Sequence, residues 1–454
     1  MGNYACWLSV LSALVLSVLS TSLICHATPS PSPWDKMLMK HKWDVIPDNW
    51  VSLGHPPNGT TINLYMALKA NLENALIDAL HEVSHPRHPK HVPFTSTPLL
   101  EACSHVLLRC FRYGAHLSRE QAAELVAPHP DTLESVFSWL KYNGVPPSSI
   151  SKTSGGSWLS IAGVPVSQAN KLLQASYELY CHTWTNETIL RTASYAIPAA
   201  LHLHVKTVVP TTAFTSTRLL EQTPRSGSGG EVAQANGGSG EPSDVLSGRD
   251  DDSYVVPSFL RWIYTMPFND PVAKGGNKLG IAGISNEIPR KQDERLFMTK
   301  YRPNAITSTV TVIPVNGGVD DRFPPGDRAN YDTQYSAALT YPTPIEYYTI
   351  GGVQKVSTTS GLPESDDQYL GWLLYMTNLP SVPQTISVPY FTKESDITSE
   401  YAHSLCKLFT ALGTRGASVL AASGDDGVGR GKCKDRSGNV KFYTVFPASC
   451  TCDV

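Results

Sequence analysis

The stretch Ala422-Ser423-Gly424-Asp425-Asp426-Gly427-Val428-Gly429 decides the fold class of this chain of 454 residues. A short apolar and partly β-branched run, residues 417–422, leads into it and is typical of a buried strand. Upstream, residues 398–412 carry apolar side chains at helical spacing, and Gly413 stands where a C-cap glycine is expected. With a further strand at 384–388, these segments predict a βαβ crossover and therefore a parallel sheet.

Asp425 follows the last of these strands in a glycine-rich loop. Open α/β sheets bind their ligands at the carboxyl ends of their strands, so Asp425 is a candidate site residue. The alternative is a tight surface turn with solvated carboxylates.

Two segments, ALGTRGASVLAASGDDGVGRGKC (residues 411–433) and FPASC (residues 446–450), resemble the sedolisin, or serine-carboxyl peptidase, family. The residues of these segments are most similar to the fungal tripeptidyl-peptidase branch, and the resemblance extends intermittently from about Trp43 to Cys450. In that family the Asp of the Ser-Gly-Asp loop helps to form the oxyanion hole, and the matching residue is Asp425. The resemblance implies a subtilisin-like, doubly wound parallel α/β sheet, incomplete here, preceded by an α+β ferredoxin-like propeptide domain.

The first 27 residues are expected to be a signal peptide, because an apolar run from Trp7 to Ile24 ends in small residues. A single-pass anchor is the alternative. Since no later run is long and apolar enough to span a bilayer, we expect a secreted, extracellular protein without a membrane partner. Asn58 and Asn186 begin Asn-x-Thr sequons and are candidate glycosylation sites.

The charges nearly balance, with 36 Lys and Arg against 39 Asp and Glu and a net charge of -3. This balance argues against a nucleic-acid partner. Cys406, Cys433, Cys450 and Cys452 allow one or two disulfides in an oxidising compartment, with the pairing left open. We expect a monomer, and the resemblance implies a peptide or protein substrate and the chain's own propeptide as partners.

Residues 28–214 are expected to form the propeptide domain. A strand and a helix (72–83) are followed by a second such pair, at 158–166 and 167–177, and by a closing strand at 201–209. Two such units predict a ferredoxin-like α+β domain. The first strand is indicated by alternating apolar residues: Ile62, Leu64, Met66 and Leu68.

Residues 91–112 have no counterpart in the family pattern and form an unexplained insertion. Residues 215–253 hold a stretch rich in Gly, Ser and acidic residues, with too few apolar side chains to form a core, and are expected to be a flexible linker. In a zymogen such a segment is a natural cleavage site.

Residues 254–454 are expected to be the N-terminal part of the peptidase domain. Strands at 279–285 and 307–315 alternate with helices at 290–301 and 328–339. This alternation predicts a doubly wound α/β sheet.

His81-Glu82-Val83-Ser84-His85 matches the zinc-peptidase pattern His-Glu-x-x-His. Against a zinc site, Pro86 follows at once and should end the helix near the second ligand. No third ligand stands out nearby, so we expect no metal at this position.

Of the 14 His, only His403 follows His204, so a Ser-His-Asp triad in the second half would have one candidate base. The resemblance instead implies a Glu base held by an Asp four residues later on one helix, and a carboxylate base suits acidic pH. Asp332 matches that Asp, but Arg328 occupies the Glu position. Because Arg328 and Asp332 are spaced i and i+4, we expect an ion pair that keeps Asp332 ionised. Asp327 is expected to cap the helix.

Pro389-Tyr390-Phe391 stands where the family presents the backbone of Ser-Tyr-Gly to its substrate, and Pro389 removes an N–H donor. The family's Ser nucleophile and its calcium loop would both lie beyond Val454, and no other cofactor is expected. The resemblance therefore implies a secreted serine-carboxyl peptidase of the tripeptidyl-peptidase type, a class that hydrolyses peptide bonds at acidic pH. Because of the departures at Arg328 and Pro389 and the missing Ser nucleophile, we expect this chain to be inactive. The alternative is a non-catalytic secreted homologue with a binding or inhibitory role.

Overall fold

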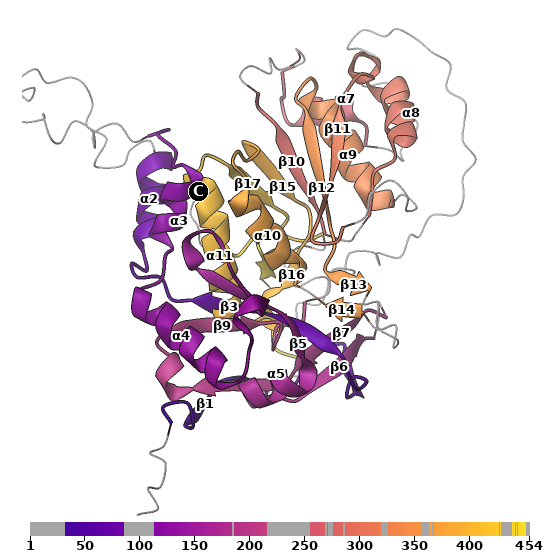
Figure 1. Cartoon of the computed structure of the whole chain (residues 1–454). Helices are drawn as coiled ribbons and strands as arrows, with labels where there is room; N and C mark the ends of the chain where they lie inside the picture. Colours follow the sequence, from indigo (N-terminus) through magenta and orange to yellow (C-terminus); the bar gives the residue numbers. More distant parts are fainter. Residues whose placement is uncertain are drawn as a thin grey trace, which may run out of the picture.

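The structure is a computed structural model, and two lobes make up the part that it describes (Figure 1). The expected signal peptide, the insertion and almost all of the linker fall outside that part. The residues described are 32–85, 113–183, 186–215, 255–267, 270, 276–284, 287–318, 326–355, 363–365, 367–425, 427, 438–440, 442 and 444–450.

The N-terminal lobe is built on a four-stranded antiparallel sheet in the order β4-β5-β3-β9. In chain order this is second, third, first and fourth, which is the strand order of a ferredoxin-like fold, and the expected α+β class is confirmed. The alternation predicted for the first strand is also confirmed, because Ile62, Leu64 and Met66 are all buried. The strands are β3 (Thr61–Leu68), β4 (Ile150–Lys152), β5 (Trp158–Pro165) and β9 (Val205–Val209).

Helices α4 and α5 share a core with this sheet, in which Trp139 and Leu172 pack against Leu64 and Leu159. The helices of this lobe are α2 (Ala75–Ser84), α3 (Arg119–Leu125), α4 (Pro130–Tyr142) and α5 (Val166–Leu173). Two smaller antiparallel sheets complete it, β1 (Met37–Lys42) with β8 (Ser194–Pro198), and β2 (Trp50–Gly54) with β6 (Tyr177–His182) and β7 (Thr188–Thr192).

The C-terminal lobe is built on a five-stranded sheet in the order β11-β12-β10-β15-β17, and every pairing in it is parallel. The first strand along the chain, β10, therefore lies in the middle of the sheet. The chain leaves β10 toward β11 and β12 and then crosses over to β15 on the other side. The strands are β10 (Leu279–Gly283), β11 (Val310–Val315), β12 (Ile345–Ile350), β15 (Thr385–Val388) and β17 (Ser418–Ala421).

Helices cover both faces of the parallel sheet, as the predicted doubly wound fold requires (Figure 1). On one face Met298 and Ala337 pack against Ile281, and on the other Trp372 and Leu405 belong to the same core as Ile386. The helices are α7 (Pro257–Ile263), α8 (Lys291–Tyr301), α9 (Asp327–Thr340), α10 (Gln368–Asn378) and α11 (Ser399–Thr414). Short strands β13 (Val353–Lys355) with β14 (Pro363–Ser365), and β16 (Thr392–Lys393) with β18 (Val445–Phe446), complete the lobe.

The predicted βαβ crossover is confirmed as β15, α11 and β17, but the predicted role of Gly413 is wrong. Helix α11 continues through Gly413 and is capped by Arg415. A Cβ atom on Gly413 would lie 2.9 Å from Cδ1 of Leu80 in α2. The glycine therefore allows α2 and α11 to pack closely, and Gly416, with φ +89°, supplies the left-handed residue after the helix.

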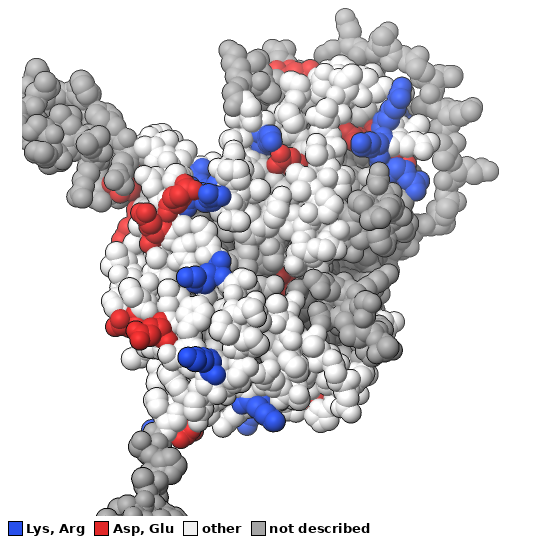
Figure 2. All heavy atoms as spheres, viewed as in Figure 1, with Lys and Arg blue, Asp and Glu red and all other residues white. Residues whose placement is uncertain are grey.

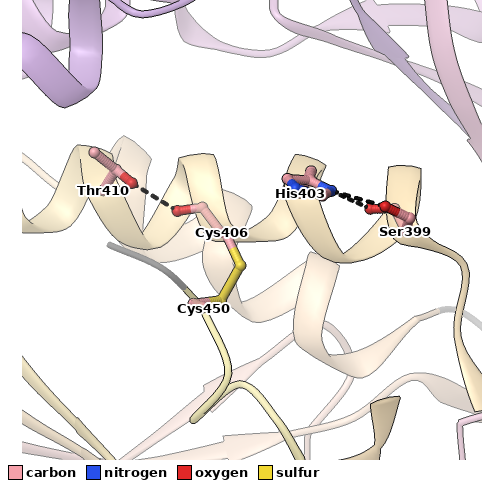
Figure 3. Close-up of a disulfide and its surroundings, with 5 residues drawn as sticks. All are labelled: Ser399, His403, Cys406, Thr410 and Cys450. Carbon is pink, nitrogen blue, oxygen red and sulfur yellow. Dashed lines mark hydrogen bonds between the residues drawn. A yellow bond between two sulfur atoms is a disulfide. The ribbon is translucent and has the colours of Figure 1, made fainter. Parts of the chain in front are cut away.

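Helix α11 also carries one half of a disulfide, which joins Cys406 to Cys450 across a sequence separation of 44 (Figure 3). This pairing was left open by the sequence, and Cys433 and Cys452 lie outside the described residues. Among the described residues, Cys181 is a free, half-buried thiol on β6. No helix in the part of the chain that the structure describes is long and apolar enough to cross a membrane.

Candidate active site

Side chains from four segments meet at the carboxyl ends of the parallel strands. Glu287 follows β10, Tyr390 follows β15 and Asp425 follows β17, while Arg328 lies in the first turn of α9. This edge includes the point where the chain reverses its direction of strand addition, which is where open α/β sheets bind ligands.

The N-terminus of α9 is held by Glu287. Oε2 of Glu287 accepts a hydrogen bond of 3.1 Å from the backbone N–H of Ala329. Asp327 is the first helical residue and not the cap, so the predicted capping role is wrong. The N-cap residue is Gly326, whose missing side chain leaves room, because a Cβ there would lie 2.0 Å from Oε2 of Glu287. A carboxylate from the neighbouring loop thus replaces a local cap.

Arg328 points from α9 toward the ends of the strands. Its guanidinium lies over the ring of Tyr390, 5.1 Å from the ring centroid, and one of its nitrogens is 3.9 Å from Oδ2 of Asp425. Side chains of a helix lean toward its N-terminus, which carries the long Arg328 away from the turn that holds Asp332. The predicted ion pair between Arg328 and Asp332 is therefore wrong.

Asp332 lies one helical turn after Arg328 in α9, close to Tyr347 of β12. Its Oδ2 is buried and has no hydrogen-bond partner among the described residues. Burial raises the pKa of Asp332 to about 7, the positive charge of Arg328 offsets this rise in part, and the negative charge of Glu287 adds to it. Below neutral pH Asp332 is therefore a neutral carboxyl group, and the expectation that it stays ionised is wrong.

A buried tyrosine, Tyr347, lies close to Tyr390, Asp332 and Glu287. Tyr347 on β12 has no exposed surface, and burial raises its pKa well above the usual value, with further contributions from Tyr390, Asp332 and Glu287. Its hydroxyl reaches the first strand, where a Cβ on Gly283 would lie 2.4 Å from it. Gly283 is thus required for the tyrosine to reach this position.

The loop after β15 faces inward. Tyr390 and Phe391 are buried, and the Phe391 ring lies 3.5 Å from the place where a Cβ of Gly424 would be. Gly424 has φ +94° and precedes Asp425, whose side chain is 57% exposed. Phe391 therefore packs against the Ser-Gly-Asp loop at Gly424, while Asp425 stays accessible to solvent.

The zinc-peptidase pattern does not form a site. Helix α2 ends at Ser84, as the following proline predicts, and His85 is its C-cap. Within the described ranges, no group of three His, Cys, Asp or Glu side chains is placed so that it could hold a metal ion.

His403 is turned along its own helix. Its Nδ1 lies 2.7 Å from the carbonyl oxygen and 3.1 Å from Oγ of Ser399 (Figure 3). The imidazole is thus engaged within α11 and is not one of the groups at the strand ends.

Fold and site together define a class of protein: a ferredoxin-like α+β domain precedes and packs on a doubly wound α/β domain that has acidic residues at the carboxyl ends of its parallel strands. Residues 109–214 match the family described as Pro-kumamolisin, activation domain. Tripeptidyl-peptidase SED2 of Arthroderma otae is 25% identical over 433 residues, which cover 93% of this chain and 67% of the relative. Probable tripeptidyl-peptidase SED3 of Arthroderma benhamiae is 28% identical over 423 residues, covering 89% and 64%.

Among solved structures, a Pseudomonas sedolisin complexed with two molecules of pseudo-iodotyrostatin matches with a TM-score of 0.30 and 19% identity, over 43% of this chain and 51% of that one. The sequence matches carry the assignment. The chain is therefore similar to fungal tripeptidyl-peptidases of the sedolisin type, and its residues 109–214 match the activation domain of that family.

Sequence reasoning placed Arg328, Asp332 and Asp425 in one region, and the structure brings Arg328 to Asp425 and leaves Asp332 nearby. It missed Glu287 and Tyr347. The rule that selected Asp425, a position just after a parallel strand, applies equally to Glu287. Tyr347 gave no such signal, because a tyrosine within a strand is usual.

Proposed function

We propose that the protein is a sedolisin-type peptidase homologue that binds peptides in acidic extracellular surroundings, and that this chain does not hydrolyse them. The tripeptidyl-peptidase relatives support a peptide as the ligand. The observation that carries the proposal is the position of Arg328, which holds a permanent cation against Tyr390 and Asp425.

A general base must take a proton from the nucleophile, and a guanidinium cannot do so because it stays protonated at every working pH. Arg328 also lies over the ring of Tyr390 and approaches the carboxylate of Asp425 to 3.9 Å. The residue proposed to stabilise an oxyanion thus already has a cationic neighbour.

Asp332 supports an acidic working environment. Since its pKa is about 7, it is neutral in acid and can donate a hydrogen bond from a mostly buried position. A second proton-accepting group, Glu287, already accepts the N–H of Ala329. The neutral Asp332 can therefore hydrogen-bond a peptide at this edge, whereas no group at the Arg328 position can remove a proton from a nucleophile.

The test incubates the purified chain with a fluorogenic tripeptide substrate at pH 4.5 and measures both turnover and binding of the peptide. We expect binding without release of the fluorophore. Turnover that survives purification and disappears in Asp332→Asn would refute the inactivity, and a peptide that is neither bound nor cleaved would refute the peptide ligand. Arg328→Gln is the matched variant, since it removes the cation without supplying a base.

Secretion, a monomeric state and glycosylation are further parts of the proposal. Asn58 and Asn186 are both exposed, which is compatible with modification. Calcium is carried over from the family only, and no step is assigned to it.

A further inference from the structure

A cavity of about 360 Å³ lies where the two lobes meet, and none of the residues of the candidate active site lines it. The N-terminal lobe contributes α3 and parts of β3 and β5, and the C-terminal lobe contributes α10 and α11. Its volume falls at the low end of the 300–1,000 Å³ that is usual for small-molecule sites. The cavity is large enough for a compact organic ligand.

The inner wall of the cavity is apolar and comes from both lobes. Trp158 and Leu68 are buried on the side of the N-terminal lobe, and Leu408 and Ala411 are buried on the side of α11. Tyr375 of α10 adds an aromatic ring. Such a wall favours the apolar part of a ligand.

The cavity also has a set of basic side chains, again drawn from both lobes: Arg119, Lys152, Lys206, Lys407 and Arg415. Among the described residues, two carboxylates form ion pairs with them. Glu73 lies against Lys206 and 3.4 Å from Lys407, and Glu120 is 2.8 Å from Arg119. Basic groups therefore outnumber these acidic partners by three. On the face shown in Figure 2, basic groups lie beside acidic groups over the region where Figure 1 places α2, α3 and α11.

Two of the cations are positioned by backbone contacts. Arg415 donates hydrogen bonds of 3.0 and 2.6 Å to the carbonyl oxygens of Thr377 and Leu379, at the end of α10. Arg119 donates one of 3.2 Å to the carbonyl oxygen of Asn378. These contacts hold both guanidinium groups beside the cavity before any ligand arrives.

The pKa of Lys407 reflects the excess of positive charge at the cavity. Burial, followed by the neighbouring Lys206, lowers the pKa of Lys407 to about 8, although Glu73 acts in the opposite direction. A bound anion would relieve this repulsion.

We propose that this cavity binds a small carboxylate that carries an apolar group, the apolar part against Trp158 and Leu408 and the carboxylate beside Lys206 and Lys407. Two sources share this chemistry, a free organic acid and the C-terminus of a hydrophobic peptide. Because both lobes line the cavity, a bound ligand also stabilises the docking of the propeptide domain. The site is independent of the question whether the chain hydrolyses peptides.

The experiment uses the full chain and isothermal titration with 3-phenylpropionate, together with thermal unfolding. We expect saturable binding and a midpoint of unfolding that rises by a few degrees. 3-Phenylpropionamide, which lacks the charge, should not bind. Equal binding of the amide, binding of inorganic phosphate alone, or no binding of the carboxylate would each overturn the proposal.

Substitutions locate the ligand. Lys407→Gln should weaken binding about tenfold or more, since a charge-assisted hydrogen bond is lost. Lys152→Gln, on the exposed strand β4, is a second variant with little risk to folding and should weaken binding to a smaller extent. Lys300→Gln, on α8, is the matched control and should leave the affinity unchanged. An affinity that none of the cavity variants changes would refute this location.

The tripeptide Ala-Ala-Phe and its C-terminal amide distinguish the two sources. Tighter binding of the peptide acid than of 3-phenylpropionate, with no binding of the amide, supports a peptide C-terminus. Binding of 3-phenylpropionate alone supports a free organic acid.

Discussion

Replacement of Asp332 by asparagine should change how the stability of the protein depends on pH. The folded state raises the pKa of this carboxyl group from 3.8 to about 7, chiefly through burial. A carboxyl group with a raised pKa contributes stability below its unfolded pKa, and that contribution is lost as pH rises through the folded pKa. At ~1.4 kcal/mol per pH unit over about three units, the loss between pH 4 and pH 8 is about 4 kcal/mol.

Asparagine has the same shape and does not ionise, so Asp332→Asn should match the parent protein at pH 4 within ~1 kcal/mol. At pH 8 it should be more stable by up to about 4 kcal/mol. Urea denaturation at pH 4, 6 and 8 measures the difference between the two proteins, which isolates this group from all other titrations. A constant difference between parent and Asp332→Asn across this range would refute the reasoning.

Three further changes test the packing within each of the two lobes. Arg191→Met should destabilise the protein by about 3 kcal/mol in urea denaturation, because Arg191 is fully buried and donates to two backbone carbonyls. Loss of the disulfide in the double variant Cys406→Ala, Cys450→Ala should lower the free energy of unfolding by about 4 kcal/mol, as expected for a closed loop of this length. Gly155→Ala should lower the midpoint of thermal unfolding well below Gly163→Ala, because both glycines have positive φ but only at Gly155 would a Cβ meet a backbone oxygen, at 2.2 Å. Equal effects of the two glycine variants would contradict this.

The overall fold could be predicted because its signals are local. Alternating apolar residues placed Ile62, Leu64 and Met66 on one face of β3, and the apolar spacing of residues 398–412 located α11 within two residues at its C-terminal end. Gly413 shows the limit of such patterns. A glycine near the end of a helix favours a C-cap, but the contact with Leu80 comes from a helix more than 300 positions away, which no local pattern contains.

The site could be located but not assembled from the sequence. Asp425 and Glu287 both follow parallel strands, so the topology places them at one edge. The spacing of Arg328 and Asp332 predicted a pair on one helix face, and this failed because a long side chain can reach partners beyond its own helix. Tyr390 and Asp425 lie in the loops after β15 and β17, so their contacts with Arg328 depend on the tertiary structure.

Arg328 of α9 contacts Asp425 instead of the expected Asp332, and this change of partner has a chemical consequence. A carboxylate base held by a second carboxylate needs two groups, one turn apart, that can share a proton. Here the first position carries a cation that faces Asp425, and the second carries an acid with one buried oxygen that has no hydrogen-bond partner among the described residues. Lowering the pH adds a proton to Asp332 and leaves Arg328 unchanged, so no pH between 4 and 8 produces a base at the first position. An effect of acid on this site therefore acts through the neutral form of Asp332, on stability and hydrogen bonding, and not through activation of a nucleophile by Arg328.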